Sequence, residues 1–492
     1  FERDFAVEKV IKLEQNYRSH GNILDAANAL IRHNRTRLGK NLWTAEGEGE
    51  PLRLFEASTD SDEAAYILDE VRSLQNEGVH LSEMALLYRS NAQSRVLEHA
   101  LFNGAIAYRV YGGLRFFERQ EIKHALGYLR LVANPDDDGA FLRIANFPTR
   151  GIGNRTLEQL QAAAQAGGTS LWHAACTNPP SGKAGSSIAA FVRSIEGMRE
   201  ACRGLPLPEI VEHVSQASGL IDHYRTEREG ANRVENLEEL VNAAAAFVAE
   251  DSFAAVITEV APDETTAQSS SPTSAPGSVD SEAASASLPP AQTGELSDAL
   301  TAFLTHAALE AGEHQAAAGA DALQLMTVHS AKGLEFHTVF ISGLEEGLFP
   351  HENSMNEEGG LEEERRLMYV AITRARRRLY LTHAQTRMLH GQTRYNIASR
   401  FLDEVPPQLV KRVNTAPALG VPSFKSPPPS FRAANGVIVG GFRIGQSVTH
   451  PKFGAGVIVQ AEGRGADARV QVNFRDEGLK WLALEFAKLS PA

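Results

Sequence analysis

The stretch from Leu323 to Phe336, LQLMTVHSAKGLEF, constrains the fold more than any other part of the sequence. Its apolar first part, Leu323 to Val328, predicts a buried strand that ends in a polar turn, and we expect a helix to begin near Gly333. A second apolar strand, Thr338 to Ser342, follows at once. Open α/β sheets bind ligands just beyond the carboxyl ends of their strands. Several polar residues are expected at or beyond such an end: Thr327, His329, Ser330, Lys332 and Glu335. Taken alone, the stretch is equally compatible with a polar loop between two core elements.

The same order of strand, polar turn and helix occurs earlier in the chain. Met84 to Tyr88 predicts a strand, Arg89 to Arg95 a polar turn, and the residues through Leu101 a helix. Amphipathic helices are expected over residues 8–33 and 63–76, and a Glu-rich helix over 361–376 precedes a strand at 378–382. This alternation predicts an α/β fold class.

Between Phe116 and about Phe253 the sequence predicts only helices, so we expect a helical insertion between two halves of one α/β domain. The expected helices cover 121–132, 140–144, 157–166, 188–202, 207–215 and 234–249, and a helix over 296–309 leads back to the α/β block. Residues 262–293, rich in Ser, Pro, Ala and Thr, are predicted to be disordered. Residues 406–440 predict a Pro-rich linker, and 442–492 alternate like the short strands of a small barrel.

The net charge of −13 argues neither for nor against a nucleic-acid partner, because it is concentrated in one region. Residues 234–331 contain 15 acidic residues and no Lys or Arg, and the rest of the chain carries 48 basic and 46 acidic residues. No apolar run is long enough to predict a membrane span. The start of the sequence at Phe1 resembles no signal peptide and suggests a truncated chain, and two cysteines fit a reducing, cytoplasmic setting.

Two arginines are candidates for binding a phosphoryl group. Arg18 is expected at a helix start and Arg374 at a helix end just before a strand. A planar guanidinium donates parallel hydrogen bonds and stays charged, so it can stabilise a transferring phosphate. The alternative is that both side chains are solvated or paired with Glu.

Other candidates are weaker. Three successive acids, Glu362 to Glu364, cannot point the same way on a helix and are read mostly as a solvated first turn. The histidines show no metal-ligand spacing, and no Walker A sequence occurs; Ser181 to Ala184 lacks the required spacing. The Gly-containing turn Pro148 to Thr156 could bind a phosphate at a helix N-terminus or could simply join two helices.

Together these stretches resemble the superfamily 1 DNA helicases of the UvrD/PcrA/Rep group, most of all its UvrD-like members, over nearly the whole chain. The resemblance is carried by six ordered segments: Leu13–Ser19, Leu86–Arg95, Tyr111–Ile122, Thr149–Gly153, Thr327–Phe336 and Glu364–Ala375. It implies a RecA-like motor domain formed by residues 1–115 and 320–405, a helical 2B-like insertion over 116–319, and a Tudor-like module over 441–492.

The resemblance also implies a role for each matching residue. Arg18 and Arg374 would be arginine fingers for ATP bound with Mg²⁺, Glu335 would touch the ribose, and Gln15 would shape that pocket. Single-stranded DNA would be contacted by Thr327, His329, Lys332, Arg89 and Asn91. Duplex junctions would be held by a hairpin that comprises Thr149, Arg150, Gly151 and Gly153. The 441–492 module would bind RNA polymerase.

This chain departs from the group in lacking the first motor domain, which would supply Walker A and the Mg²⁺ ligands, so we expect no ATP hydrolysis by this chain alone. The expected whole is a 3′–5′ DNA helicase of DNA repair, acting as a monomer or dimer. The competing hypothesis is a non-catalytic fragment that binds DNA and RNA polymerase. His20 stands where the group more often has Thr.

Overall fold

The computed structural model describes residues 12–35, 39–228, 230–260, 298–312, 320–389, 392–413, 441–463 and 468–491. The chain divides into two compact units. The first comprises Phe1–Gln120, Ala231–Glu239 and Ala308–Ala492, and the second comprises Glu121–Gly230 and Leu240–Ala307. Parts of the predicted helical insertion therefore belong to the first unit: residues 116–120, residues 231–239 and the residues after Ala307.

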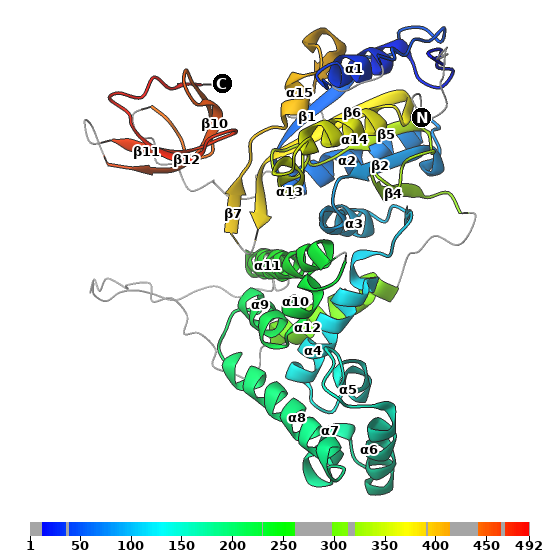
Figure 1. Ribbon diagram of the computed structural model, residues 1–492, viewed down its shortest axis with the longest axis vertical. Coiled ribbons are helices and arrows are strands. Elements are labelled where there is room, and N and C mark those ends of the chain that lie inside the picture. Colours follow the sequence, from blue (N-terminus) through cyan, green and yellow to red (C-terminus); the bar gives the residue numbers. More distant parts are fainter. Residues whose placement is uncertain are drawn as a thin grey trace, which may run out of the picture. The chain divides into compact units, whose positions relative to one another are not determined.

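An eight-stranded sheet forms the centre of the first unit (Figure 1). Its strands are β1 (Leu52–Thr59), β2 (Met84–Tyr88), β3 (Tyr108–Val110), β4 (Leu323–Thr327), β5 (Phe336–Ile341), β6 (Ala375–Leu389), β7 (Gln392–Tyr395) and β8 (Val410–Arg412). The order is β3-β4-β2-β5-β6-β1-β8, with every pair parallel, and β7 is added antiparallel to β6. The predicted α/β fold class with a parallel sheet is confirmed.

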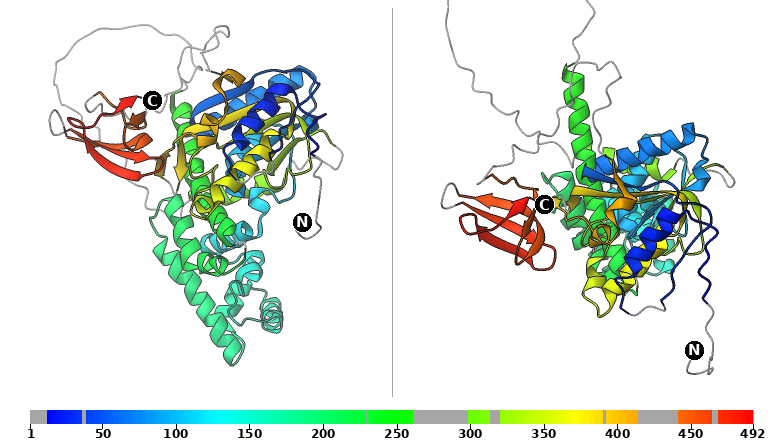
Figure 2. Two further views of the ribbon diagram at one scale, coloured as in Figure 1. Left: turned by 45° about the horizontal axis from the view of Figure 1, so that its top comes forward. Right: turned by 90° about the horizontal axis from the view of Figure 1, so that it is seen from above.

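Helices cover both faces of this sheet (Figure 2). On one face, α1 (Gly21–Ile31), α14 (Gly360–Ile372) and α15 (Arg400–Asp403) pack on β-strand residues such as Leu87 and Ile341. On the other face, α2 (Asp60–Asn76) and α3 (Ser94–Asn103) pack on residues such as Leu86 and Phe340. Neighbouring strand residues point to opposite faces, so the central strands β2, β4 and β5 are mostly apolar, as expected of strands buried on both sides.

The second unit is helical throughout its described residues. Its elements are α4 (Gln120–Ala133), α5 (Asp138–Ile144), α6 (Asn154–Gly167), α7 (Leu171–Thr177), α8 (Lys183–Ala201), α9 (Leu207–Ala217), α10 (Leu220–Arg225) and most of α11 (Gly230–Val260) and α12 (Asp298–Gly312). The sequence patterns missed the short helices α7 and α10. The segment predicted to be disordered, 262–293, lies outside the described residues.

The C-terminal residues form a separate five-stranded antiparallel sheet, ordered β12-β11-β10-β9-β13. Its strands are β9 (Ser447–His450), β10 (Gly454–Glu462), β11 (Arg469–Phe474), β12 (Gly478–Ala483) and β13 (Ser490–Pro491). Val448, Ile458, Val470 and Phe474 make its small core. The predicted small β unit is confirmed.

Three local predictions were wrong. No helix begins near Gly333: the residue has φ +92°, a left-handed conformation, and β5 begins three residues later at Phe336. Within the described residues the first helix begins at Gly21, and residues 12–20 form bends and a β-bridge where a helix was expected. Part of the expected linker, Val410–Arg412, pairs with β1 as strand β8. Among the described helices, none is both long and apolar enough to cross a membrane.

Candidate functional site

Arg18, Glu335 and Arg374 come together at the amino ends of β5 and β6. Glu335 and Arg374 immediately precede these two strands, whose first residues are joined by the bond from Phe336 N to the Arg374 carbonyl (2.9 Å). The Arg18 Nε donates to Glu335 Oε2. Among the described residues, the two terminal nitrogens of Arg18 have no hydrogen-bond partner. The three side chains, far apart in sequence, thus form one charged group.

The backbone around Arg18 is fixed by its own neighbours. Asn16 Oδ1 accepts from the backbone N–H of Arg18 (2.7 Å) and of Ser19 (2.8 Å), a turn that asparagine side chains favour. The Ser19 hydroxyl donates to the Ala375 carbonyl (2.7 Å). This bond joins the residue after Arg18 to the residue after Arg374. The pattern Asn-x-x-Ser could have predicted the turn, but the contact with Ala375 is visible only in the fold.

The Arg374 guanidinium is held inside the domain with part of its donor capacity left over. Nε donates to the Val370 carbonyl (3.1 Å), one terminal nitrogen to the Leu334 carbonyl (2.8 Å), and the other to Thr373 Oγ1 (3.2 Å). A guanidinium has five N–H donors, so one N–H on each terminal nitrogen has no partner among the described residues. Burial and the nearby Arg18 charge lower the pKa of Arg374, which Glu335 opposes. An anion placed here would relieve this crowding of positive charge.

Gln15 lies on the same segment, and its side chain is exposed. Its Oε1 accepts from the Tyr17 hydroxyl (2.8 Å), and its backbone forms a parallel bridge with Trp43. Tyr17 is 76% exposed and Trp43 51% exposed. The sequence reasoning did not single out these two aromatic residues; the unusual exposure of large rings identifies them only in the structure.

The residues predicted to contact single-stranded DNA gather at the opposite edge of the sheet. Arg89 and Asn91 follow β2, and Thr327 and His329 end or follow the neighbouring strand β4, with Tyr88 level with Thr327. The Thr327 hydroxyl caps the turn by accepting from Ser330 N (3.3 Å). Burial and the neighbouring Arg89 hold the pKa of His329 below its usual value, although His329 remains open to solvent.

Arg89 forms a two-pronged ion pair with Glu364 of α14. Nε lies 3.1 and 3.0 Å from the two carboxylate oxygens, and Nη2 lies 2.6 Å from one of them. Burial would raise the pKa of Glu364, but Arg89 outweighs it and the pKa lies below its usual value. Glu364 is buried while Glu363 is exposed, so the interpretation of this run as mostly a solvated turn was wrong for Glu364. Arg89 Nη1 has no partner among the described residues.

Glu335 lies at an amino end, which corrects the expectation that it follows a carboxyl end. Thr327 is level with Tyr88 and Thr338 with Met84, so Phe336 lies about six residues from Thr327 along the strand direction. At about 3.3 Å per residue the offset is roughly 20 Å. The segment from Val328 to Glu335 therefore crosses the sheet from one edge to the other, with Lys332 exposed on it.

In the second unit, the hairpin with Thr149, Arg150, Gly151 and Gly153 joins α5 to α6. Thr149, Gly151 and Gly153 are exposed, Gly151 adopts φ +76°, and no side chain caps the first turn of α6. The Arg150 side chain turns inward instead of toward solvent. Its terminal nitrogens donate to the carbonyls of Ile144 (3.3 Å), Pro148 (3.1 Å) and Ser218 (3.0 Å).

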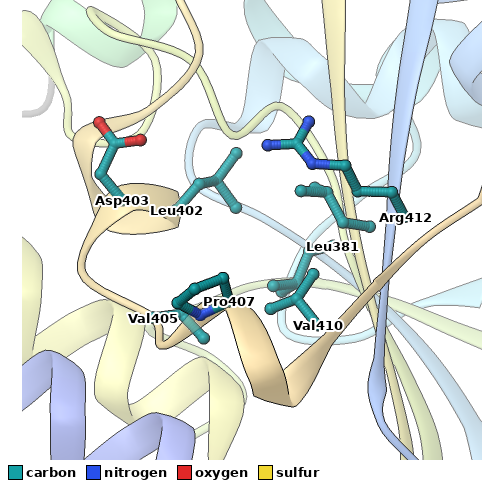
Figure 3. A pocket seen from close by; sticks show the side chains of 8 residues that line it. Leu381, Leu402, Asp403, Val405, Pro407, Val410 and Arg412 are labelled. Atoms are coloured by element: carbon teal, nitrogen blue, oxygen red, sulfur yellow. The ribbon is translucent and has the colours of Figure 1, made fainter.

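A further pocket of about 430 Å³ lies at the β1–β8 edge of the sheet, lined by Leu54, Leu381, Leu402, Asp403, Val405, Pro407, Val410 and Arg412 (Figure 3). Its lining is mostly aliphatic, with one acid and one base. None of the predicted site residues lines it, so it is not part of either group.

Comparisons with known proteins place this arrangement in a family. Residues 11–179 and 208–386 match the model of the UvrD-like helicase C-terminal domain, and residues 444–490 match that of the PcrA/UvrD tudor domain. The chain therefore belongs to the UvrD-like helicase C-terminal domain family, with a PcrA/UvrD tudor domain after it. This confirms the resemblance stated from the sequence.

Individual relatives agree with the family. The chain is 44% identical over 496 residues to DNA helicase II of Escherichia coli and 40% identical over 505 residues to DNA helicase II of Haemophilus influenzae. It is 35% identical over 511 residues to ATP-dependent DNA helicase PcrA of Bacillus subtilis. These alignments cover 99% of this chain and 62–63% of each relative, so the chain spans less than two thirds of their length.

Proposed function

We propose that this chain is the C-terminal part of an ATP-dependent 3′–5′ DNA helicase that acts in DNA repair. The observation that carries the proposal is the convergence of Arg18, Arg374 and Glu335 at one edge of the sheet, with a separate polar group at the other. One edge serves the nucleotide and the other serves single-stranded DNA. The names of the relatives, DNA helicase II and ATP-dependent DNA helicase PcrA, support this reading.

The amino-edge group fits the phosphates of ATP. Arg18 and Arg374 offer N–H donors without partners among the described residues, and the Glu335 carboxylate partly offsets their two positive charges. Arginines placed in this way stabilise the charge that develops on a transferring phosphoryl group. Glu335 can accept from a ribose hydroxyl, and Tyr17 beside Gln15 offers a flat surface for a base. The Mg²⁺ ligands and the Walker A loop are expected in a first motor domain.

The carboxyl-edge group fits a single strand. Glu364 fixes the Arg89 guanidinium and leaves Nη1 for a phosphate, while Asn91, Thr327 and His329 add polar contacts along neighbouring strand ends. Lys332 adds a positive charge on the crossing segment. Phosphate contacts of this type give affinity without sequence preference.

The remaining parts would assist the motor. Backbone N–H groups of Thr149, Gly151 and Gly153 and of the uncapped α6 terminus would hold the phosphates of a duplex junction. Those of Arg150 and Ile152 already donate to Asn146 Oδ1. Arg150 would shape this hairpin rather than touch DNA. The tudor domain, residues 441–492, would bind RNA polymerase.

Substitution of Arg374 tests the proposal. In the native protein that carries this chain, Arg374→Ala should lower DNA-stimulated ATP turnover by about a thousandfold or more, with ATP binding kept within about tenfold. Arg377→Ala is the matched control, because Arg377 lies three residues further along, on β6, and its exposed side chain forms no hydrogen bond or ion pair with the described residues. Near-normal turnover of Arg374→Ala would exclude the arginine-finger role.

The second candidate is a fragment that binds DNA and RNA polymerase without motor activity. It is favoured by the absence of a Walker A sequence from these 492 residues. ATP turnover that is absent from the native protein, together with intact single-strand binding, would favour this candidate over the helicase.

A further inference from the structure

The first turns of α11, residues Ala231–Glu239, belong to the first unit and contact the loop that follows β2. The Glu235 carboxylate accepts from the Ser90 hydroxyl (2.8 Å) and lies 3.3 Å from His351 Nε2. Burial would raise the pKa of Glu235, but the bonds from His351 and Ser90 outweigh it and the pKa lies below its usual value. Glu235 is therefore an ionised acceptor for this loop.

A second contact holds the next residue of the same loop. Arg119 Nη1 donates both to the Asn91 carbonyl (3.0 Å) and to Asn236 Oδ1 (3.0 Å), and its Nη2 donates to Ser94 Oγ (2.6 Å). Arg119 is 7% exposed and Asn236 3% exposed. Buried polar groups that form several bonds at once leave the atoms they join little freedom.

A third contact fixes the helix itself. Arg95 at the start of α3 pairs with Glu239, one turn after Glu235 on α11, and both side chains are largely buried. On α11 the three contacts involve Glu235, Asn236 and Glu239, which span slightly more than one turn of the helix. Together they define where the loop lies relative to the sheet.

The same network reaches Arg89. The backbone N–H of His351, the residue paired with Glu235, donates to Glu364 Oε2 (3.0 Å), and Glu364 holds the Arg89 guanidinium. Ser90 bonds directly to Glu235, and Asn91 is joined to Asn236 through Arg119. Arg89 is linked less directly, through Glu364 and His351 to Glu235. The α11 residues are distant from this loop in the sequence: Glu235 lies 145 positions after Ser90.

We propose that the first turns of α11 position the Arg89–Asn91 loop for single-stranded DNA, with Glu235 and Asn236 as positioning residues. This inference rests on the proposed DNA role of the loop. The inference and simple electrostatics predict opposite changes in DNA affinity when Glu235 is replaced by a neutral residue. Removing an acidic charge near a phosphate site should tighten DNA binding, whereas loss of a positioning contact should weaken it.

Binding of a fluorescein-labelled oligo-dT to the native protein, followed by fluorescence anisotropy, tests the proposal. Glu235→Ala should weaken binding about fivefold to tenfold, and Ser90→Ala by a similar factor. The double variant should be no weaker than the worse single variant, because both remove the same contact. Asn232→Ala, an exposed residue of the same helix, is the matched control and should bind normally. Unchanged or tighter binding by Glu235→Ala would overturn the inference.

Hydrogen exchange gives a second measurement that needs no DNA. Backbone amides of residues 90–93 should exchange faster in Ser90→Ala and Glu235→Ala, while those of β5 stay protected. Unchanged exchange would overturn the positioning role, as would faster exchange with unchanged DNA binding. His329→Ala separates the two proposals: if it leaves binding intact, the proposed DNA edge fails, and exchange still decides whether α11 positions the loop.

Discussion

At the scale of single residues, arginines with the same chemistry serve two different purposes. Arg18 and Arg374 keep N–H donors without partners among the described residues and crowd each other's charge. Arg150 was predicted from the sequence to contact DNA. Its guanidinium instead donates to three backbone carbonyls and lies over the rings of Tyr128 and Phe191. Residue type and spacing do not distinguish these cases, because the difference lies in where the side chain's partners sit in the fold.

Arg150→Ala should therefore destabilise the second unit by about 2–4 kcal/mol, since buried carbonyls lose a charged donor and two rings lose a packing partner. Trp172 in α7 reports on this unit, so urea unfolding followed by its fluorescence, with Trp43 and Trp481 changed to Phe, measures the effect. Arg155→Ala, an exposed neighbour, is the control. Equal midpoints for the two variants would contradict the inward role of Arg150.

The acidic run on α14 shows what sequence predicts at this scale. Successive residues on a helix point about 100° apart, so the sequence alone could have predicted that one of the three acids faces the core. Which one, and that Arg89 would be its partner, depends on the pairing of β2 with β5 and on the placement of α14. Arg89 and Glu364 themselves are 275 positions apart in the sequence.

At the scale of elements, segments with a regular hydrophobic pattern were predicted correctly, and segments that mix apolar and charged residues were not. The apolar strands β2, β4 and β5 and the amphipathic helix α2 were predicted because they are buried on both faces or along one stripe. Strand β1 was missed because its burial alternates irregularly. The edge of the sheet at which Glu335 lies was predicted wrongly, because a strand and not a helix follows the turn at Gly333.

The hairpin before α6 allows a test in which two effects have opposite signs. Gly153 is the N-cap of α6, has φ −82° and leaves open space around an added side chain. Gly153→Asp should stabilise the second unit by a few tenths of a kcal/mol, because an acidic N-cap is favourable. It should weaken binding of a duplex junction about fivefold, because the carboxylate repels phosphate.

Gly153→Ser is the matched control for this prediction, because its hydroxyl caps the same N–H donors without adding charge. It should bind the junction about fivefold more tightly than Gly153→Asp. Thermal unfolding and gel-shift titration of the same preparations measure both effects. If Gly153→Asp binds the junction as tightly as Gly153→Ser, no phosphate lies near this terminus.

At the scale of the whole molecule, the tudor domain is a self-contained sheet with its own core. Its removal should leave the sheet of the first unit and both of its edge groups folded. Deletion of residues 441–492 should therefore spare DNA unwinding by the native protein and abolish its pull-down of RNA polymerase. Retention of polymerase by the deletion variant would assign that contact to another part of the chain.

We propose that the segment from Thr327 to Glu335 joins a DNA-binding edge to a nucleotide-binding edge of the sheet, roughly 20 Å away at ~3.3 Å per residue. Equilibrium binding of oligo-dT and of ATP, measured separately on His329→Ala and Glu335→Ala, tests this claim most directly. We expect His329→Ala to weaken oligo-dT binding several-fold with ATP binding within twofold, and Glu335→Ala to do the reverse. If both variants weaken both ligands equally, or if their effects are exchanged, the assignment of nucleotide and DNA to opposite edges is wrong.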